Sequence, residues 1–151
     1  MKKYFILLAA VAVAACGCDR KPATPQLFEA SAFQTEVDCK QTSLYTLTNT
    51  SGMTVQLTNY GARIVDLWVP AKVGSFKDVV MGFETINDYL NAKDINNGPV
   101  VGRIGNRTGK GRFTLDGTEY QPTINHGANH LHRGTGGFAS RCGAAVQDGT
   151  S

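Results

Sequence analysis

The chain after Phe33 consists of short segments in which apolar and polar residues alternate with the two-residue period of a β-strand. The clearest alternation covers 53–58 and is typical of a half-buried strand. The stretch 63–69, RIVDLWV, is rich in β-branched and aromatic residues and predicts a second strand, which Pro70 should end by withholding a ladder donor. A third strand is expected at 78–81. The pattern therefore predicts an all-β chain.

A short helix is expected to interrupt the strands at 85–90, TINDYL. Thr85 suits the N-cap, and Asp88 stands three residues later, in the position that a capping box uses. The apolar residues of this segment fall on one helical face: Ile86, Tyr89 and Leu90.

The strongest local signal is a hairpin turn at Asp116 and Gly117, between strand-like segments at 112–115 and 118–122. A two-residue type I′ turn needs positive φ at both central residues. Glycine adopts it freely and aspartate better than most residues, so a hairpin is predicted here.

The N-terminus has the layout of a bacterial export signal: two lysines followed by an apolar run, 4–15, that is too short to span a bilayer. It ends in VAAC, which resembles the lipobox of bacterial lipoproteins, so cleavage before Cys16 would leave a thiol for lipid attachment. Gly17 after this cysteine favours the outer membrane by the same resemblance. Cys18 is an alternative acceptor in a poorer recognition sequence.

We therefore divide the chain into a signal peptide over 1–15, a lipidated cysteine and polar tether over 16–32, and one folded domain over 33–151. The 42% hydrophobic and 18% charged residues are ordinary for a globular domain. The formal charge is +3, but several cations lie in or beside the leader, so nucleic acid is not expected as a partner. The expected location is the bacterial envelope, at the periplasmic face of the outer membrane or the cell surface.

Two cysteines fall in the folded region, Cys39 and Cys142. An oxidising periplasm would permit a disulfide between them, but an isolated pair is poor evidence for one, and two unpaired thiols are the favoured alternative. The sequence leaves both alternatives open.

Neither a phosphate loop nor a metal site fits the glycine- and histidine-rich region. Within the stretch 102–112, GRIGNRTGKGR, the spacing from Gly105 to Gly109 is one residue too short for a P-loop, and Gly111 follows Lys110 where a P-loop has Ser or Thr. His130 and His132, as a His-x-His pair on a strand, would point to one face, but no carboxylate occurs over 133–142 to complete a metal site. We expect no metal and no cofactor, and we expect His126 to be a surface residue in a turn.

The same region holds a polar cluster on each side of the predicted hairpin: Asn106 and Arg107 before it, and His130 and His132 after it. In a folded chain these flanks can converge on one cleft. Amide, guanidinium and imidazole groups offer the directional hydrogen bonds that a polyhydroxylated ligand requires. Sugar chemistry is therefore the first hypothesis.

Four separated blocks of the chain resemble the aldose 1-epimerase (galactose mutarotase) family in order and spacing: NYGARIVDLWVP, DVVMGFETINDYL, VGRIGNRTGKGRFTLDGTEYQ and NHLHRGTGGF. The resemblance covers about 33–141 and implies a large antiparallel β-sandwich of the mutarotase type, with this chain as roughly its first half. It also implies an enzyme without metal or cofactor that interconverts the α and β anomers of free hexoses such as galactose and glucose.

Matched residue by residue, the resemblance implies that Asn106 and Arg107 hydrogen-bond sugar hydroxyls. It implies that His132 contacts the sugar near its ring oxygen and anomeric hydroxyl, with His130 as a neighbour. The family usually has Gly-Gly after this histidine, whereas Arg133 stands here. A bulky charged side chain at that point would narrow the loop or add a hydroxyl contact.

In the resembling family the general acid is a second histidine and the base is a glutamate, both expected beyond Ser151. We therefore assign no catalytic residue within this chain, expect it to be truncated and expect little catalysis from it alone. Two alternatives remain open. One is a noncatalytic carbohydrate-binding lipoprotein, and the other is a related epimerase of hexose phosphates, which Arg133 and Lys110 would favour.

Overall fold

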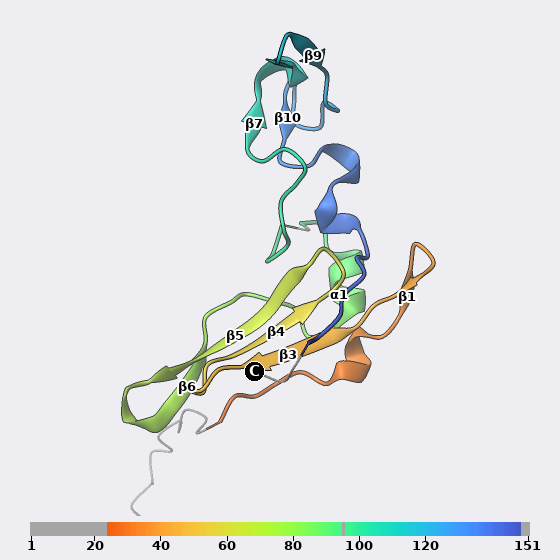
Figure 1. Cartoon of the computed structure of the whole chain (residues 1–151). Coiled ribbons are helices and arrows are strands. Elements are labelled where there is room, and N and C mark those ends of the chain that lie inside the picture. Colours follow the sequence, from red (N-terminus) through yellow and green to blue (C-terminus); the bar gives the residue numbers. More distant parts are fainter. Residues whose placement is uncertain (1–23, 95, 149–151) are drawn as a thin grey trace, which may run out of the picture.

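The computed structural model describes residues 24–94 and 96–148, which form a four-stranded antiparallel sheet at one end and a slender extension at the other (Figure 1). The sheet has the order β3-β4-β5-β6, each strand pairing with its neighbour in sequence: β3 (Leu44–Thr48), β4 (Thr54–Thr58), β5 (Arg63–Ala71) and β6 (Ser75–Asp78). The antiparallel all-β fold class expected from the sequence is confirmed.

Smaller elements complete the described chain. Three two-stranded ladders pair β1 (Glu36–Val37) with β2 (Lys40–Gln41), β7 (Arg107–Thr108) with β10 (His130–Leu131), and β8 (Phe113–Leu115) with β9 (Thr118–Tyr120). The α-helix is α1 (Ile86–Asn91), and the 3-10 helices are Ala30–Phe33, Lys72–Gly74, Gly109–Gly111, Gly134–Gly136 and Phe138–Ser140.

The proposed signal peptide over 1–15, Cys16 and the first part of the tether lie outside the described residues. Within 24–94 and 96–148, no helix has the length and apolar character needed to cross a bilayer.

Two strand boundaries differ from the sequence prediction. β5 continues through Pro70 to Ala71, because its pairing with β4 stops at Trp68, opposite Thr54, and only β6 pairs with β5 at the proline. The missing donor of Pro70 therefore breaks no ladder on the β4 side. The third strand is β6, which ends at Asp78 instead of beginning there.

The polar face of β4 is the buried one. Thr54, Gln56 and Thr58 are 3%, 2% and 1% exposed, whereas Val55 and Leu57 on the other face are only partly buried. The Gln56 amide explains this, because its oxygen accepts from the Phe28 backbone N–H at 2.8 Å and its nitrogen donates to the Phe28 carbonyl at 3.1 Å. The N-terminal segment thus covers that face of the sheet, and both the oxygen and the nitrogen of the Gln56 side-chain amide are hydrogen-bonded.

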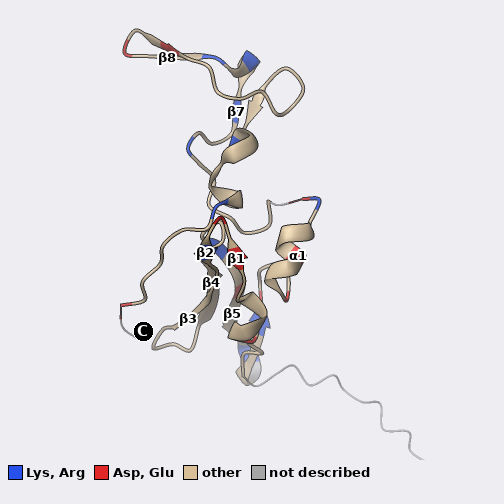
Figure 2. Ribbon diagram, turned by 90° about the vertical axis from the view of Figure 1, so that its right-hand side faces the viewer, with Lys and Arg blue, Asp and Glu red and all other residues tan. Residues whose placement is uncertain are grey.

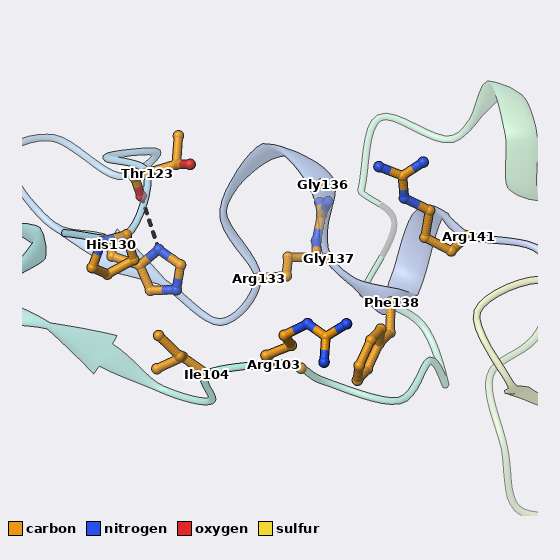
Figure 3. A pocket seen from close by; sticks show the side chains of 11 residues that line it. Arg103, Ile104, Thr123, His130, Arg133, Gly136, Gly137, Phe138 and Arg141 are labelled. Carbon is orange, nitrogen blue, oxygen red and sulfur yellow. Dashed lines mark hydrogen bonds between the residues drawn. The ribbon is translucent and has the colours of Figure 1, made fainter. Parts of the chain in front are cut away.

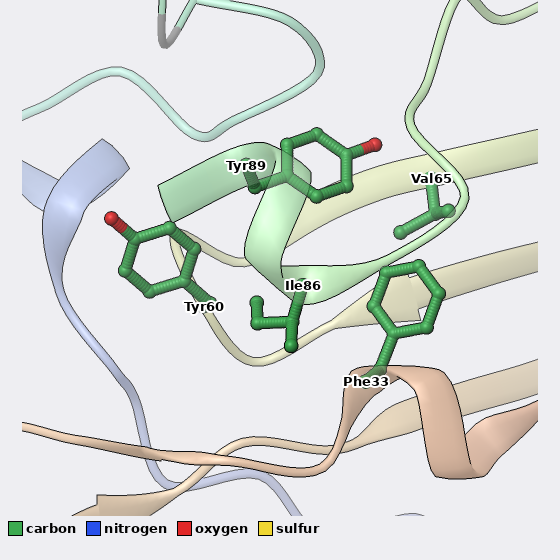
Figure 4. Close-up of a cluster of buried hydrophobic side chains, with 5 residues drawn as sticks. All are labelled: Phe33, Tyr60, Val65, Ile86 and Tyr89. Atoms are coloured by element: carbon green, nitrogen blue, oxygen red, sulfur yellow. The ribbon is translucent and has the colours of Figure 1, made fainter. Parts of the chain in front are cut away.

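The buried core lies between this face, the first 3-10 helix and α1, and consists of five side chains: Phe33, Tyr60, Val65, Ile86 and Tyr89 (Figure 4). The expected helix is confirmed, since the Thr85 hydroxyl accepts from the Asp88 N–H at 3.2 Å and caps α1. The apolar face is narrower than expected, because Leu90 is exposed.

Arg63, at the start of β5, is fully buried beside this core. Its guanidinium donates to the carbonyl oxygens of Asn97 at 3.0 Å and Ala139 at 2.9 Å. It also lies over the rings of Tyr89, at 4.6 Å, and Tyr60, at 5.5 Å. Arg63 therefore ties the sheet to both ends of the extension.

The two cysteines of the folded region are unpaired thiols, with Cys39 exposed and Cys142 buried. Burial raises the pKa of the Cys142 thiol, because the charged thiolate loses solvation there. Of the two alternatives that the sequence left open, the structure has the unpaired one.

Candidate functional site

The extension is built on the ladder between β7 and β10, which pairs Arg107 with Leu131 and Thr108 with His130. This short ladder brings together two segments that the β8–β9 hairpin separates in sequence. The hairpin is as predicted: Asp116 and Gly117 have φ of 50° and 79°, and Leu115 pairs with Thr118. The ladder therefore brings the two flanks side by side.

Asn106 and His132 are joined by two reciprocal hydrogen bonds. The backbone N–H of His132 donates to the Asn106 carbonyl at 2.8 Å, and the backbone N–H of Asn106 donates to Nδ1 of His132 at 3.1 Å. Because Nδ1 accepts, the neutral ring carries its proton on Nε2. The Asn106 backbone thus sets His132 to present an N–H donor on its other side.

Both residues hold left-handed backbone conformations, with φ of 59° at Asn106 and 53° at His132. Such conformations are uncommon outside glycine, and asparagine and histidine are among the residues that tolerate them best. Strained residues of this kind gather at binding and catalytic sites, where the surrounding structure holds them in place. Here the reciprocal hydrogen bonds provide that support.

Arg107 is held beside this pair. Its backbone N–H donates to Oδ1 of Asn106 at 2.9 Å, and its guanidinium Nη1 lies 2.7 Å from Nδ1 of His126. His126 is exposed, as expected, but it also orients the Arg107 side chain. The three predicted sugar-contacting residues, Asn106, Arg107 and His132, therefore form one connected group.

A pocket of about 410 Å³ lies next to this group, and Figure 3 shows its walls. Its lining comes from three stretches: Gly102 to Ile104, Pro122 and Thr123, and residues of 130–141 that include His130, Arg133, Phe138 and Arg141. Asn106, Arg107 and His132 are not among the lining residues. The hollow therefore adjoins the predicted group instead of being formed by it.

The two histidines of the His-x-His pair do not share a face as the sequence suggested. β10 ends at Leu131, and the positive φ of His132 turns its side chain toward Asn106. His130 is 4% exposed, and its Nδ1 lies 2.8 Å from the Thr123 carbonyl oxygen. The period-2 rule fails here because the strand is only two residues long.

Sequence reasoning missed Arg103 and Arg141 as pocket residues. The one sequence feature that could have indicated this pocket is Gly137. A Cβ there would collide with the Arg133 side chain and lie 2.7 Å from the Gly102 carbonyl oxygen. Gly137 therefore lets the two walls approach each other closely. Among the described residues, no three of the His, Cys, Asp and Glu side chains are grouped so that they could hold a metal ion.

Comparison with known proteins gives the family. The family model described as aldose 1-epimerase matches residues 43–141, more than half of the sequence. The chain belongs to the aldose 1-epimerase family. The match contains all three residues of the group described above.

Individual relatives agree with this assignment. The chain is similar to the galactose mutarotase of Bos taurus, with 46% identity over 84 residues, which is 56% of this chain and 24% of that protein. The aldose 1-epimerase of Escherichia coli (strain K12) is 33% identical over 98 residues, covering 65% of this chain and 28% of that protein. The chain thus spans about a quarter of the length of the curated relatives that it matches.

Solved structures show the same fold. The GalM/aldose epimerase homologue from C. elegans superimposes with a TM-score of 0.65 and 31% identity, over 72% of this chain and 33% of that one. Galactose 1-epimerase from Lactobacillus acidophilus NCFM gives a TM-score of 0.58 and 28% identity, over 72% of this chain and 31% of that one.

Proposed function

We propose that this chain serves the interconversion of α and β anomers of free hexoses, and that Asn106, Arg107 and His132 bind the sugar. The observation that carries the proposal is the reciprocal pair between Asn106 and His132, which fixes an N–H donor on Nε2 of His132. Family membership supplies the reaction class.

The chemistry of the group suits this role. Mutarotation opens the pyranose ring when a base takes the proton of the anomeric hydroxyl and an acid protonates the ring oxygen. A donor at Nε2 of His132 can hydrogen-bond an oxygen at the anomeric end of the sugar, while the Arg107 guanidinium donates to hydroxyls. We assign binding and orientation to these residues and no proton transfer.

Titration of the full chain with galactose tests the proposal. We expect saturable binding by calorimetry, because three oriented polar groups distinguish a sugar from water. Following the optical rotation of freshly dissolved α-galactose in the same samples then separates two functions. Faster mutarotation supports an active epimerase, and binding without acceleration supports the noncatalytic carbohydrate-binding alternative. A chain that binds no hexose contradicts both.

We also propose that the chain is exported and anchored through lipid on Cys16, in the bacterial envelope. The support is the sequence alone: an apolar leader that ends in VAAC. In a bacterial host, radiolabelled palmitate is expected to enter the wild-type chain and the Cys18→Ser control, and to be lost in Cys16→Ser. Two or three acyl chains anchor a protein stably, so Cys16→Ser should also leave the membrane fraction. Equal labelling of wild type and Cys16→Ser would contradict the assignment.

A further inference from the structure

The pocket beside the proposed sugar-binding group is strongly cationic. Its lining contains Arg103, Arg133 and Arg141 together with His130, and neither Asp nor Glu is among the described lining residues. Figure 2 shows Lys and Arg residues spread along the extension and the segment that joins it to the sheet. Three guanidinium groups around one hollow attract an anion, and they can bind an oxyanion with paired N–H donors.

Other groups of the protein neutralise the positive charges of the pocket arginines only weakly. Arg103 lies over the Phe138 ring, at 5.6 Å from the ring centroid, a contact that leaves its N–H edge available for a ligand. Arg141 pairs with Asp38 at 3.7 Å, but both side chains are more than half exposed, at 61% and 54%. Such an exposed pair is weak and readily exchanged for another partner.

Arg133 is the most buried of the three pocket arginines, since Arg103 and Arg141 are exposed. It is partly buried, and its charge is one of the causes that lower the pKa of the buried Arg63, after desolvation, which is the largest. The two guanidinium groups therefore repel each other. An anion bound at Arg133 would relieve this repulsion.

His130 adds a second, independent feature. Its side chain is 4% exposed, and its Nδ1 donates to the Thr123 carbonyl, so in the neutral ring Nε2 is an acceptor. Within residues 24–94 and 96–148, Nε2 has no hydrogen-bond partner. Figure 3 shows this nitrogen on the side of the ring away from Thr123, facing toward Ile104 in the pocket wall. A buried acceptor of this kind is normally satisfied, and a ligand hydroxyl would satisfy it.

We propose that this pocket binds the acidic group of a charged sugar, so that the preferred ligand is a hexose carrying a phosphate or a carboxylate. The arginines bind the oxyanion, and a sugar hydroxyl donates to Nε2 of His130. The inference rests on the proposed function, because the adjoining Asn106, Arg107 and His132 bind the rest of the sugar. The volume of about 410 Å³ lies within the range of small-molecule sites.

Calorimetric titration of the full chain tests the inference, with four probes: D-glucose 6-phosphate, D-galacturonate, D-galactose and inorganic phosphate. We expect at least one acidic sugar to bind about tenfold more tightly than galactose, since charge-assisted hydrogen bonds are about twice as strong as neutral ones. The tighter of the two acidic sugars identifies phosphate or carboxylate as the natural group. Inorganic phosphate should bind more weakly than the tighter acidic sugar, because it lacks the sugar contacts.

Matched variants locate the site. Arg133→Ala, which keeps the Cβ, is expected to lower the affinity for the acidic sugar about tenfold and to lower the affinity for galactose by clearly less. Arg133→Gln preserves more of the side chain and should give the same result if the alanine variant unfolds. Arg112→Ala removes an exposed cation outside the pocket and is expected to change nothing.

The possible failures are distinct. If galactose binds and the acidic sugars bind no better, the inference is overturned and the proposed function stands. The inference is also overturned if Arg133→Ala and Arg133→Gln retain full affinity for the acidic sugar, or if inorganic phosphate binds as tightly as the tighter of the two acidic sugars. If none of the four probes binds, both this inference and the proposed function are contradicted.

Discussion

Replacement of Arg63 by methionine is expected to lower the free energy of unfolding by at least about 3 kcal/mol. Arg63 is fully buried, and its guanidinium donates to two carbonyl oxygens from distant segments, Asn97 and Ala139. Each hydrogen bond from a charged donor contributes about 1.5–3 kcal/mol. Methionine keeps much of the volume but leaves both carbonyls without this donor, and it also removes the stacking on Tyr60 and Tyr89.

Urea denaturation followed by circular dichroism measures this change. Arg112→Met is the matched control, because Arg112 is exposed and makes only a 3.8 Å ion pair with Glu119, so its loss should change stability by less than about 0.5 kcal/mol. An Arg63→Met chain as stable as the control would show that Arg63 does not tie the extension to the sheet.

The second large effect concerns His132. His132→Asn is expected to weaken galactose binding about tenfold or more while the fold stays intact. The Asn side chain can place an acceptor near the position of Nδ1, so the Asn106 N–H keeps a partner, and asparagine tolerates the φ of 53°. It has no group at the position of Nε2, so the proposed donor to the sugar is lost.

Comparison with His132→Ala separates the structural role of His132 from its proposed role in sugar binding. Alanine removes both the acceptor and the donor, and it fits the left-handed conformation poorly. We therefore expect His132→Ala to lose stability as well as affinity, measured by thermal unfolding and by calorimetry with galactose. Unchanged galactose affinity in a folded His132→Asn chain would remove His132 from the proposed site.

Local sequence signals predicted local structure well. The hairpin at Asp116 and Gly117 follows from two adjacent residues that accept positive φ. The helix at 86–91 follows from Thr85 and Asp88, three residues apart. In both cases the determining contacts lie within a few residues, so the chain segment itself contains the information.

Features that depend on distant contacts were not predictable in the same way. The polar face of β4 is buried because Gln56 pairs with Phe28, which is 28 residues away. The cationic pocket combines Arg103 with Arg133 and Arg141, which only the fold brings together. The sequence predicted that Asn106, Arg107 and His132 act as a group. It could not place the pocket beside them, because His130 and His132 turn to different sides where β10 ends.

The central claim is that Asn106, Arg107 and His132 together contact the sugar. Titration of isotopically labelled full-length chain with galactose, followed by two-dimensional ¹⁵N and side-chain NMR spectra, tests it most directly. We predict that the largest shifts occur at the backbone amides of Asn106 and Arg107, the Arg107 guanidinium and the His132 ring, and that β3 and β4 of the sheet are unaffected. Saturable shifts located elsewhere, with these three residues unchanged, would contradict the claim.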